Sequence, residues 1–134
     1  MSDQHSAETR AARRTILVVE DELLLLQILA EELEDMGYRV LSTMRGDEAL
    51  KQLEAAALAI DLLITDIRLP GALDGWTIAE EARRIKPELP VIYVTGYSAN
   101  APREVPGSIL IPKPYRLAAI INAARQLGVD AEAA

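Results

Sequence analysis

The sequence contains no cysteine and a single histidine, His5, among its 134 residues. The absence of cysteine excludes disulfide bonds, a thiol nucleophile and thiolate metal ligands, and it is typical of proteins of the reducing cytoplasm. Because the histidine lies in a polar leader, neither a histidine-based metal site nor a Ser-His-Asp triad is expected. Any chemistry of this chain therefore depends on carboxylate, hydroxyl and ammonium groups.

The chain also lacks long apolar runs and clusters of basic residues. No run approaches the roughly 20 residues that span a bilayer, and Arg13 and Arg14 precede only the short run ILVV, which is not the pattern of a signal peptide. The net charge of −7 disfavours direct binding to nucleic acid, because the phosphates would repel an acidic domain. We therefore expect a cytoplasmic protein that binds neither membranes nor nucleic acid directly.

Short apolar runs alternate with helical segments along the rest of the chain, and half of all residues are hydrophobic, which suits one globular domain. Near-continuous apolar strands separated by helices predict a parallel sheet covered on both faces, in an open doubly wound α/β fold. The expected strands are 15–19, 38–42, 61–66, 90–95 and 108–112. The expected helices are 23–36, from Asp47 to about 57, 75–86 and 115–128.

A helix is missing from this alternation between the last two strands. The connecting stretch GYSANAPREVPG (96–107) holds two glycines, two prolines and one asparagine. Pro102 is placed to begin a single turn after Asn100, and Pro106 and Gly107 would end that turn at once. The sequence therefore predicts that the fourth helix is absent or reduced to one turn.

Polar side chains gather where the predicted strands end. Glu20 and Asp21 follow the first strand, Asp66 ends the third, Thr95 ends the fourth and Lys113 follows the fifth. Each of these residues taken singly is more commonly a helix cap, a strand residue or a solvated charge. In a parallel sheet, however, the carboxyl ends of the strands share one edge, and that edge is where ligands bind. We therefore expect one site containing all of them.

Carboxylates this close repel one another unless a cation neutralises them. An oxygen-only ligand set suits a hard cation, and Mg²⁺ fits best because it binds one or two carboxylates and shares its other positions with water and phosphate oxygens. Lys113 supplies a positive charge and Thr95 a hydroxyl donor for an anion. The pattern predicts a phosphoryl site beside Mg²⁺, with a carboxylate as the acceptor.

The segments ILVVEDE, DLLITDIRLPGALDGW, VTGY and IPKPY together resemble the receiver domain of two-component response regulators, the CheY-like family. The resemblance implies a flavodoxin-like five-stranded sheet of order 2-1-3-4-5. It places the receiver domain over 14–128, between a flexible tail at 1–13 and a short tail at 129–134. With no output domain in this chain, we expect a stand-alone regulator.

The resemblance also assigns roles to the strand-end residues. Asp66 would be the phosphoacceptor, and the carboxylates of Glu20, Asp21 and Asp66 together with the backbone carbonyl of Arg68 would hold Mg²⁺. Asp21 would be the more direct ligand of the acidic pair.

Three further residues would complete the acceptor site. Thr95 would bond the phosphoryl oxygen and carry the switch. Lys113 would pair with the phosphate, and its peptide bond to Pro114 would be cis.

The implied function is that of a two-component response regulator rather than a turnover enzyme. A histidine kinase would phosphorylate Asp66, the phosphoryl group would be lost by slow self-dephosphorylation, and phosphorylation would switch binding to a downstream protein whose identity stays open. One alternative is a pseudo-receiver that acts as an unphosphorylated scaffold. A less favoured one is an Asp-nucleophile phosphohydrolase, whose family has Asp-x-Asp where this chain has Asp66-Ile67-Arg68.

The stretch PVIYVTGY (90–97) partly matches a receiver subgroup with the motif Pro-Phe-x-Phe-Ala-Thr-Gly-Tyr. Pro90, Thr95, Gly96 and Tyr97 match, and Tyr93 stands for the second phenylalanine. The subgroup tends to work with HWE-type histidine kinases, which we therefore expect as the partner class.

The first predicted helix holds more leucines than one buried stripe requires. The expected core stripe is Leu25, Leu29, Leu33 and Met36. The surplus leucines suggest a contact with the kinase, because this helix belongs to the docking surface of receivers; they are Leu23, Leu24 and Leu26.

The residue three positions before Lys113, where ordinary receivers carry the switch aromatic, is Leu110. We predict that Tyr97 takes over its role, because Tyr97 follows Thr95 by two residues on a glycine-flanked loop that phosphorylation can reorder. Replacing Tyr97 by alanine should abolish the chemical-shift changes that phosphorylation produces in residues 96–107, as measured by NMR. Unchanged shifts would show that Tyr97 only packs over the end of the strand.

Overall fold

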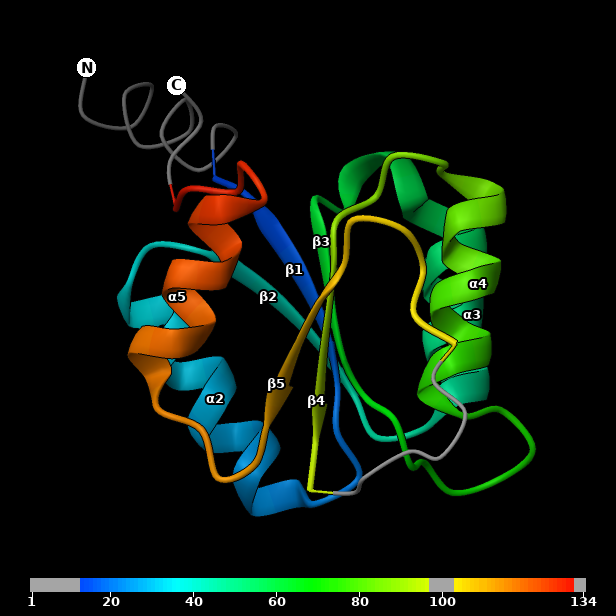
Figure 1. The fold of residues 1–134 in the computed structure, drawn as a ribbon, viewed down its shortest axis with the longest axis horizontal. Coiled ribbons are helices and arrows are strands. Elements are labelled where there is room, and N and C mark those ends of the chain that lie inside the picture. Colours follow the sequence, from blue (N-terminus) through cyan, green and yellow to red (C-terminus); the bar gives the residue numbers. More distant parts are fainter. Residues whose placement is uncertain (1–12, 97–102, 132–134) are drawn as a thin grey trace.

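The structure is a computed structural model and describes residues 13–96 and 103–131. A single five-stranded sheet of strand order β2-β1-β3-β4-β5 is parallel throughout (Figure 1). The strands are β1 (Thr15–Val19), β2 (Arg39–Thr43), β3 (Leu62–Asp66), β4 (Val91–Thr95) and β5 (Ile109–Pro112). The helices are α2 (Leu23–Asp35), α3 (Gly46–Ala56), the 3₁₀ turn η1 (Ala57–Ala59), α4 (Gly75–Ile85) and α5 (Leu117–Gln126).

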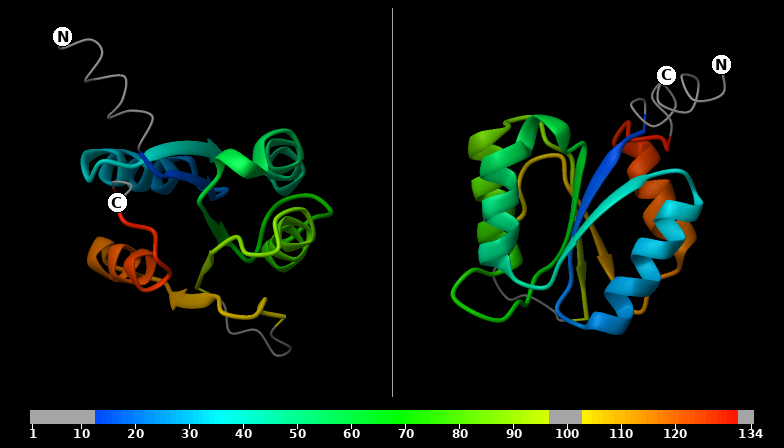
Figure 2. Two further views of the ribbon diagram at one scale, coloured as in Figure 1. Left: turned by 90° about the horizontal axis from the view of Figure 1, so that it is seen from above. Right: turned by 180° about the vertical axis from the view of Figure 1, so that it is seen from behind.

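The helices cover both faces of the sheet. α2 and α5 lie on one face, and α3 and α4 lie on the other (Figures 1 and 2). Each face has its own apolar cluster, and the three inner strands β1, β3 and β4 are buried along their whole length. The predicted flavodoxin-like, doubly wound α/β fold is confirmed. In the described part of the chain, no helix is long and apolar enough to cross a bilayer.

The predicted core stripe of α2 is partly wrong. Leu29 and Leu33 are buried as expected, but the third buried residue of the helix is Leu26, at 5% exposure, and Met36 is 41% exposed. Leu25 is only half-buried. Four leucines in succession carry no helical period, so the sequence alone did not fix which of them faces the sheet.

Several boundaries differ by one or two residues from the sequence-based expectation, and two differences have a clear structural cause. α3 begins at Gly46 with Arg45 in the cap position, so Asp47 lies in the first turn and is not the N-cap. At the other end of the chain, Val129 is buried in the core and its carbonyl accepts a hydrogen bond of 2.8 Å from the Tyr38 hydroxyl. Ala131 also packs against this cluster, so the packed region extends beyond the predicted boundary at 128.

The predicted loss of the fourth helix falls between β4 and β5. Residues 97–102, Tyr97 among them, lie outside the described residues. Residues 103–108 form a turn and contain no helical residue. The reduced helix and the role of Tyr97 stay predictions.

α4 begins directly against the strand that ends in Asp66. The Gly75 N–H donates a 2.7 Å hydrogen bond to the Ile67 carbonyl. A Cβ atom at Gly75 would overlap the Asp66 carbonyl oxygen and lie 2.8 Å from the Ile67 Cα atom. A glycine is therefore needed here for the close approach of two backbones.

We predict that Gly75→Ala lowers the free energy of unfolding by about 1–3 kcal/mol, because the backbone of α4 would have to move away from β3. Urea denaturation of both proteins measures the change. Gly96→Ala is the matched control, since its Cβ would lie 3.8 Å from the nearest atom, and it should change stability by less than about 0.5 kcal/mol. Equal losses in the two variants would contradict the steric explanation.

Candidate functional site

The carboxyl ends of β1, β3, β4 and β5 meet around one open hollow of about 340 Å³. Five of the predicted site residues that the structure describes line this hollow, and Glu20 adjoins it. The hollow is lined by Asp21, Glu22, Asp66, Arg68, Thr95, Gly96 and Lys113.

Glu20 lies beneath the hollow and is 3% exposed. Its Oε1 atom accepts a 2.9 Å hydrogen bond from the Lys113 ammonium, and its Oε2 atom accepts one of 3.0 Å from the Glu22 N–H. Both oxygens of this carboxylate therefore hold neighbouring groups in place: the Glu22 N–H in the chain that follows β1, and the Lys113 ammonium after β5.

The Lys113 ammonium joins Glu20 to Asp66. It donates a second hydrogen bond, of 2.8 Å, to Asp66 Oδ2, and all three side chains are largely buried. Burial on its own would lower the pKa of Lys113, but the hydrogen bonds and charges of Asp66 and Glu20 outweigh it and raise that pKa above the ordinary value. The ammonium therefore stays charged at neutral pH. Its hydrogen bond fixes the position of the Asp66 carboxylate.

Three carboxylates form the acidic part of the site. Glu20, Asp21 and Asp66 each offer one oxygen, and these oxygens lie within 4.8 Å of one another. The pKa of Asp21 is raised by partial burial and by the hydrogen bond and charge of Glu20, so its ionised form is disfavoured. A cation at this position would remove that penalty, and an all-oxygen donor set fits Mg²⁺.

The other predicted residues have different surroundings. Thr95 is buried at the end of β4, and its carbonyl accepts a 2.7 Å hydrogen bond from the Lys113 N–H, which fixes the two strand ends together. The Lys113-Pro114 peptide bond is cis. Arg68 is exposed at the rim of the hollow. Tyr97 is outside the described residues.

A second hollow, of about 290 Å³ and mostly apolar, lies on the other side of Lys113 between α2 and the start of α5. The sequence analysis did not identify it, although the surplus leucines of α2 pointed to this helix. Leu24 on the same helix is 70% exposed. The hollow is lined by Leu25, Ile28, Leu29, Glu32, Lys113, Pro114, Tyr115 and Leu117.

Comparisons with known proteins agree with this geometry. The family model described as the response regulator receiver domain matches residues 16–125. The chain is 30% identical over 117 residues to the sensor kinase CckA of Brucella abortus. The match covers 84% of this chain but only 12% of the length of that kinase. It is 31% identical to the response regulator receiver protein CpdR of Brucella abortus, with 81% of this chain and 92% of that protein covered.

Solved structures give the same result. A response regulator receiver protein from Sinorhizobium medicae is 39% identical with a TM-score of 0.81, and the match covers 86% of this chain and 94% of that one. The response regulator TrrA from Thermotoga maritima, solved in complex with Mg²⁺ and BeF, is 30% identical with a TM-score of 0.74, covering 85% and 98%. This chain therefore shares its fold with these proteins.

We predict that Mg²⁺ stabilises the protein against heat, by about 2.7 kcal/mol when free Mg²⁺ is 100 times its Kd. Asp21→Asn should remove most of this gain, since it takes away a carboxylate of the acidic group. Glu22→Gln is the matched control, because Glu22 is the neighbouring carboxylate and is not part of that group. Thermal denaturation with and without Mg²⁺ measures the effect, and an undiminished gain in Asp21→Asn would place the ion elsewhere.

Proposed function

The chain belongs to the response regulator receiver family, and on that premise we propose that it is a two-component response regulator that takes a phosphoryl group on Asp66 from a histidine kinase. One observation carries the proposal. The Asp66 carboxylate closes a strand at the edge of the sheet, bonded to the Lys113 ammonium and within reach of two further carboxylates.

The residues present perform the parts of such a transfer. A carboxylate oxygen of Asp66 attacks the phosphorus atom of a phosphohistidine, the P–N bond breaks, and its electrons return to the imidazole. Lys113, already bonded to Asp66, neutralises charge on the acceptor and on the incoming group. Thr95, buried at the end of the neighbouring strand, would donate a hydrogen bond from its hydroxyl to a phosphoryl oxygen.

The acidic group would hold Mg²⁺ through Glu20, Asp21 and Asp66, with the Arg68 carbonyl as a further ligand. When bound, the ion neutralises negative charge between the carboxylates and the phosphoryl oxygens. Glu20 has its own oxygens engaged by Lys113 and the Glu22 N–H. Its main contribution is therefore to orient Lys113 and the start of α2, with Asp21 the more accessible carboxylate of the pair.

The proposed partner is a histidine kinase of the HWE type, in the cytoplasm. The partial motif at 90–97 supports the kinase class. The exposed Leu23 and Leu24 and the apolar hollow beside Lys113 support docking of the kinase along α2, next to the acceptor site. Phosphorylation would then alter binding to a downstream protein.

Incubation with Mg²⁺ and a small acyl-phosphate donor, followed by intact mass measurement, tests the proposal. We expect one phosphoryl adduct that requires Mg²⁺ and that is lost in Asp66→Asn. Asp61→Asn is the matched control and should be phosphorylated normally, because Asp61 pairs with the Thr15 N–H at the opposite end of the sheet.

Two results would contradict the proposal. No adduct on the folded protein, with either the acyl phosphate or purified HWE-type kinases, would favour the scaffold alternative. Continuous release of phosphate from phosphate esters would favour the phosphohydrolase.

A further inference from the structure

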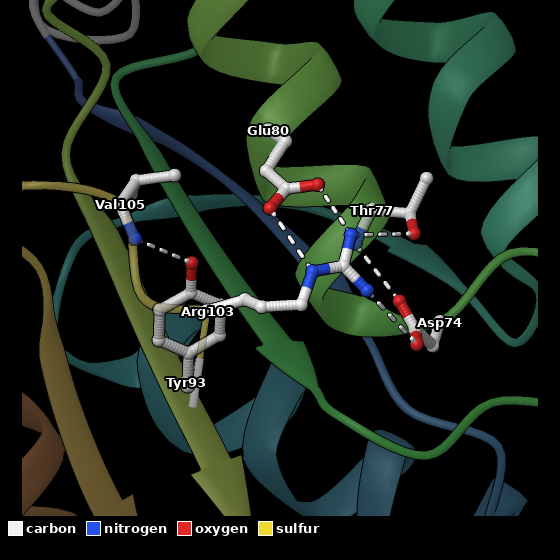
Figure 3. Close-up of polar contacts among 6 residues, drawn as sticks. All are labelled: Asp74, Thr77, Glu80, Tyr93, Arg103 and Val105. Carbon is white, nitrogen blue, oxygen red and sulfur yellow. Dashed lines mark hydrogen bonds and ion pairs between the residues drawn. The ribbon is translucent and has the colours of Figure 1, made fainter. Parts of the chain in front are cut away.

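The chain that leads into β5 lies against α4, and one arginine makes most of the polar contacts. The Arg103 guanidinium donates to both carboxylate oxygens of Glu80, with a distance of 3.2 Å from Nε to Oε2 (Figure 3). The Nη2 atom, which donates to Glu80 Oε1, also lies 3.4 Å from the Thr77 hydroxyl, and Nη1 lies 3.9 Å from an oxygen of Asp74. Three successive acceptors on one side of α4 therefore surround a single cation.

Val105 provides a second, buried contact two residues further on. Its side chain is 8% exposed and belongs to the core on the α3 and α4 side of the sheet. Its N–H donates a 3.1 Å hydrogen bond to the Tyr93 hydroxyl of β4 (Figure 3). The centre of the Tyr93 ring lies 4.8 Å from the centre of the Trp76 ring of α4. We call residues 103–108 the docked segment.

Both contacts connect the docked segment to residues that adjoin the site around Asp66. Tyr93 precedes Thr95 by two residues on β4, so the two side chains point to the same face of the sheet. Asp74 caps α4 through a 2.8 Å hydrogen bond from the Thr77 N–H, and the next residue, Gly75, is bonded to the Ile67 carbonyl beside Asp66. The docked segment therefore contacts α4, which follows Asp66, and β4, which ends in Thr95.

The two contacts differ in how easily they are lost. Exposed ion pairs are weak and are screened by salt, whereas a buried side chain and a buried hydrogen bond are not. A bidentate pair also depends strongly on geometry. A small shift of β4 relative to the start of α4 would therefore disturb Arg103 before it disturbed Val105.

We propose that Arg103 is a positioning residue whose ion pairs with Asp74 and Glu80 latch the docked segment onto α4, and that phosphorylation of Asp66 weakens this latch. The inference rests on the proposed function of Asp66. Its consequence is that α4 and the docked segment form the surface that changes between the two states of the regulator.

Hydrogen exchange of the Val105 amide, followed by NMR, tests the latch. We expect exchange in the full chain to accelerate when Mg²⁺ and beryllofluoride, a phosphoryl mimic, are added. Without the mimic, Arg103→Gln should accelerate exchange roughly two- to fivefold, the size expected for exposed ion pairs. Added salt should accelerate exchange in the unmodified protein and have little effect in this variant.

Two variants separate the latch from general loss of charge or of structure. Arg84→Gln removes an exposed arginine of α4 that pairs with Glu81 within the helix, and it should behave like the unmodified protein. Arg103→Lys keeps the charge and loses the bidentate contact, so it should fall between the unmodified protein and Arg103→Gln.

Each contrary result has a distinct meaning. Unchanged Val105 exchange in Arg103→Gln would show that Arg103 does not hold the segment. Unchanged exchange when beryllofluoride shifts the signals around Asp66 would show that the segment does not respond, and the inference would be wrong while the receiver function stands. If beryllofluoride, acyl phosphate and purified HWE-type kinases all fail to act on Asp66, the proposed function fails and the inference fails with it.

Discussion

The contact of the Lys113 ammonium with Asp66 and Glu20 is the interaction on which the rest of the site depends. It gathers one positive charge and two carboxylates at an edge of the sheet where Asp21 adds a third. Opposite charges within hydrogen-bond distance offset the repulsion and the desolvation that this crowding would otherwise cause. The bond also spans the sheet, because its partners come from the ends of β1, β3 and β5, so the charge balance and the alignment of the strands depend on each other.

α4 begins very close to this acidic edge. On the proposed function, Asp66 at the end of β3 has to be accessible to a phosphoryl donor, while the chain that follows it returns at once to the core. Gly75 makes that return possible by letting α4 begin against the Asp66 and Ile67 backbone. Trp76 then packs on Tyr93, so the helix that follows Asp66 contacts the strand that ends in Thr95.

The strand order came from the family resemblance, but the parallel, doubly wound sheet and the meeting of the strand-end residues were predictable from the sequence for one physical reason. Strands buried on both faces read as continuous apolar runs, and the ends of parallel strands coincide, so the polar residues that follow the runs had to meet. The same reasoning failed where that signal is absent. The run of leucines in α2 has no period, so Leu26 was not recognised as buried, and the capping position of α3 went to Arg45, which no propensity favours.

Contacts between segments distant in the sequence were beyond prediction for a different reason. Arg103 lies 23 positions from Glu80, and an arginine in a loop reads as a solvated charge. Tyr93 read as a substituted aromatic of a motif, but its hydroxyl binds the Val105 N–H, a contact that a phenylalanine at this position would not make. The tyrosine thus gives β4 a polar link to the docked segment on the same face as Thr95. If both proposals hold, the two faces of the sheet have different roles. The kinase binds on the α2 side beside Lys113, and phosphorylation of Asp66 changes the contacts of Tyr93 and Arg103 on the α4 side.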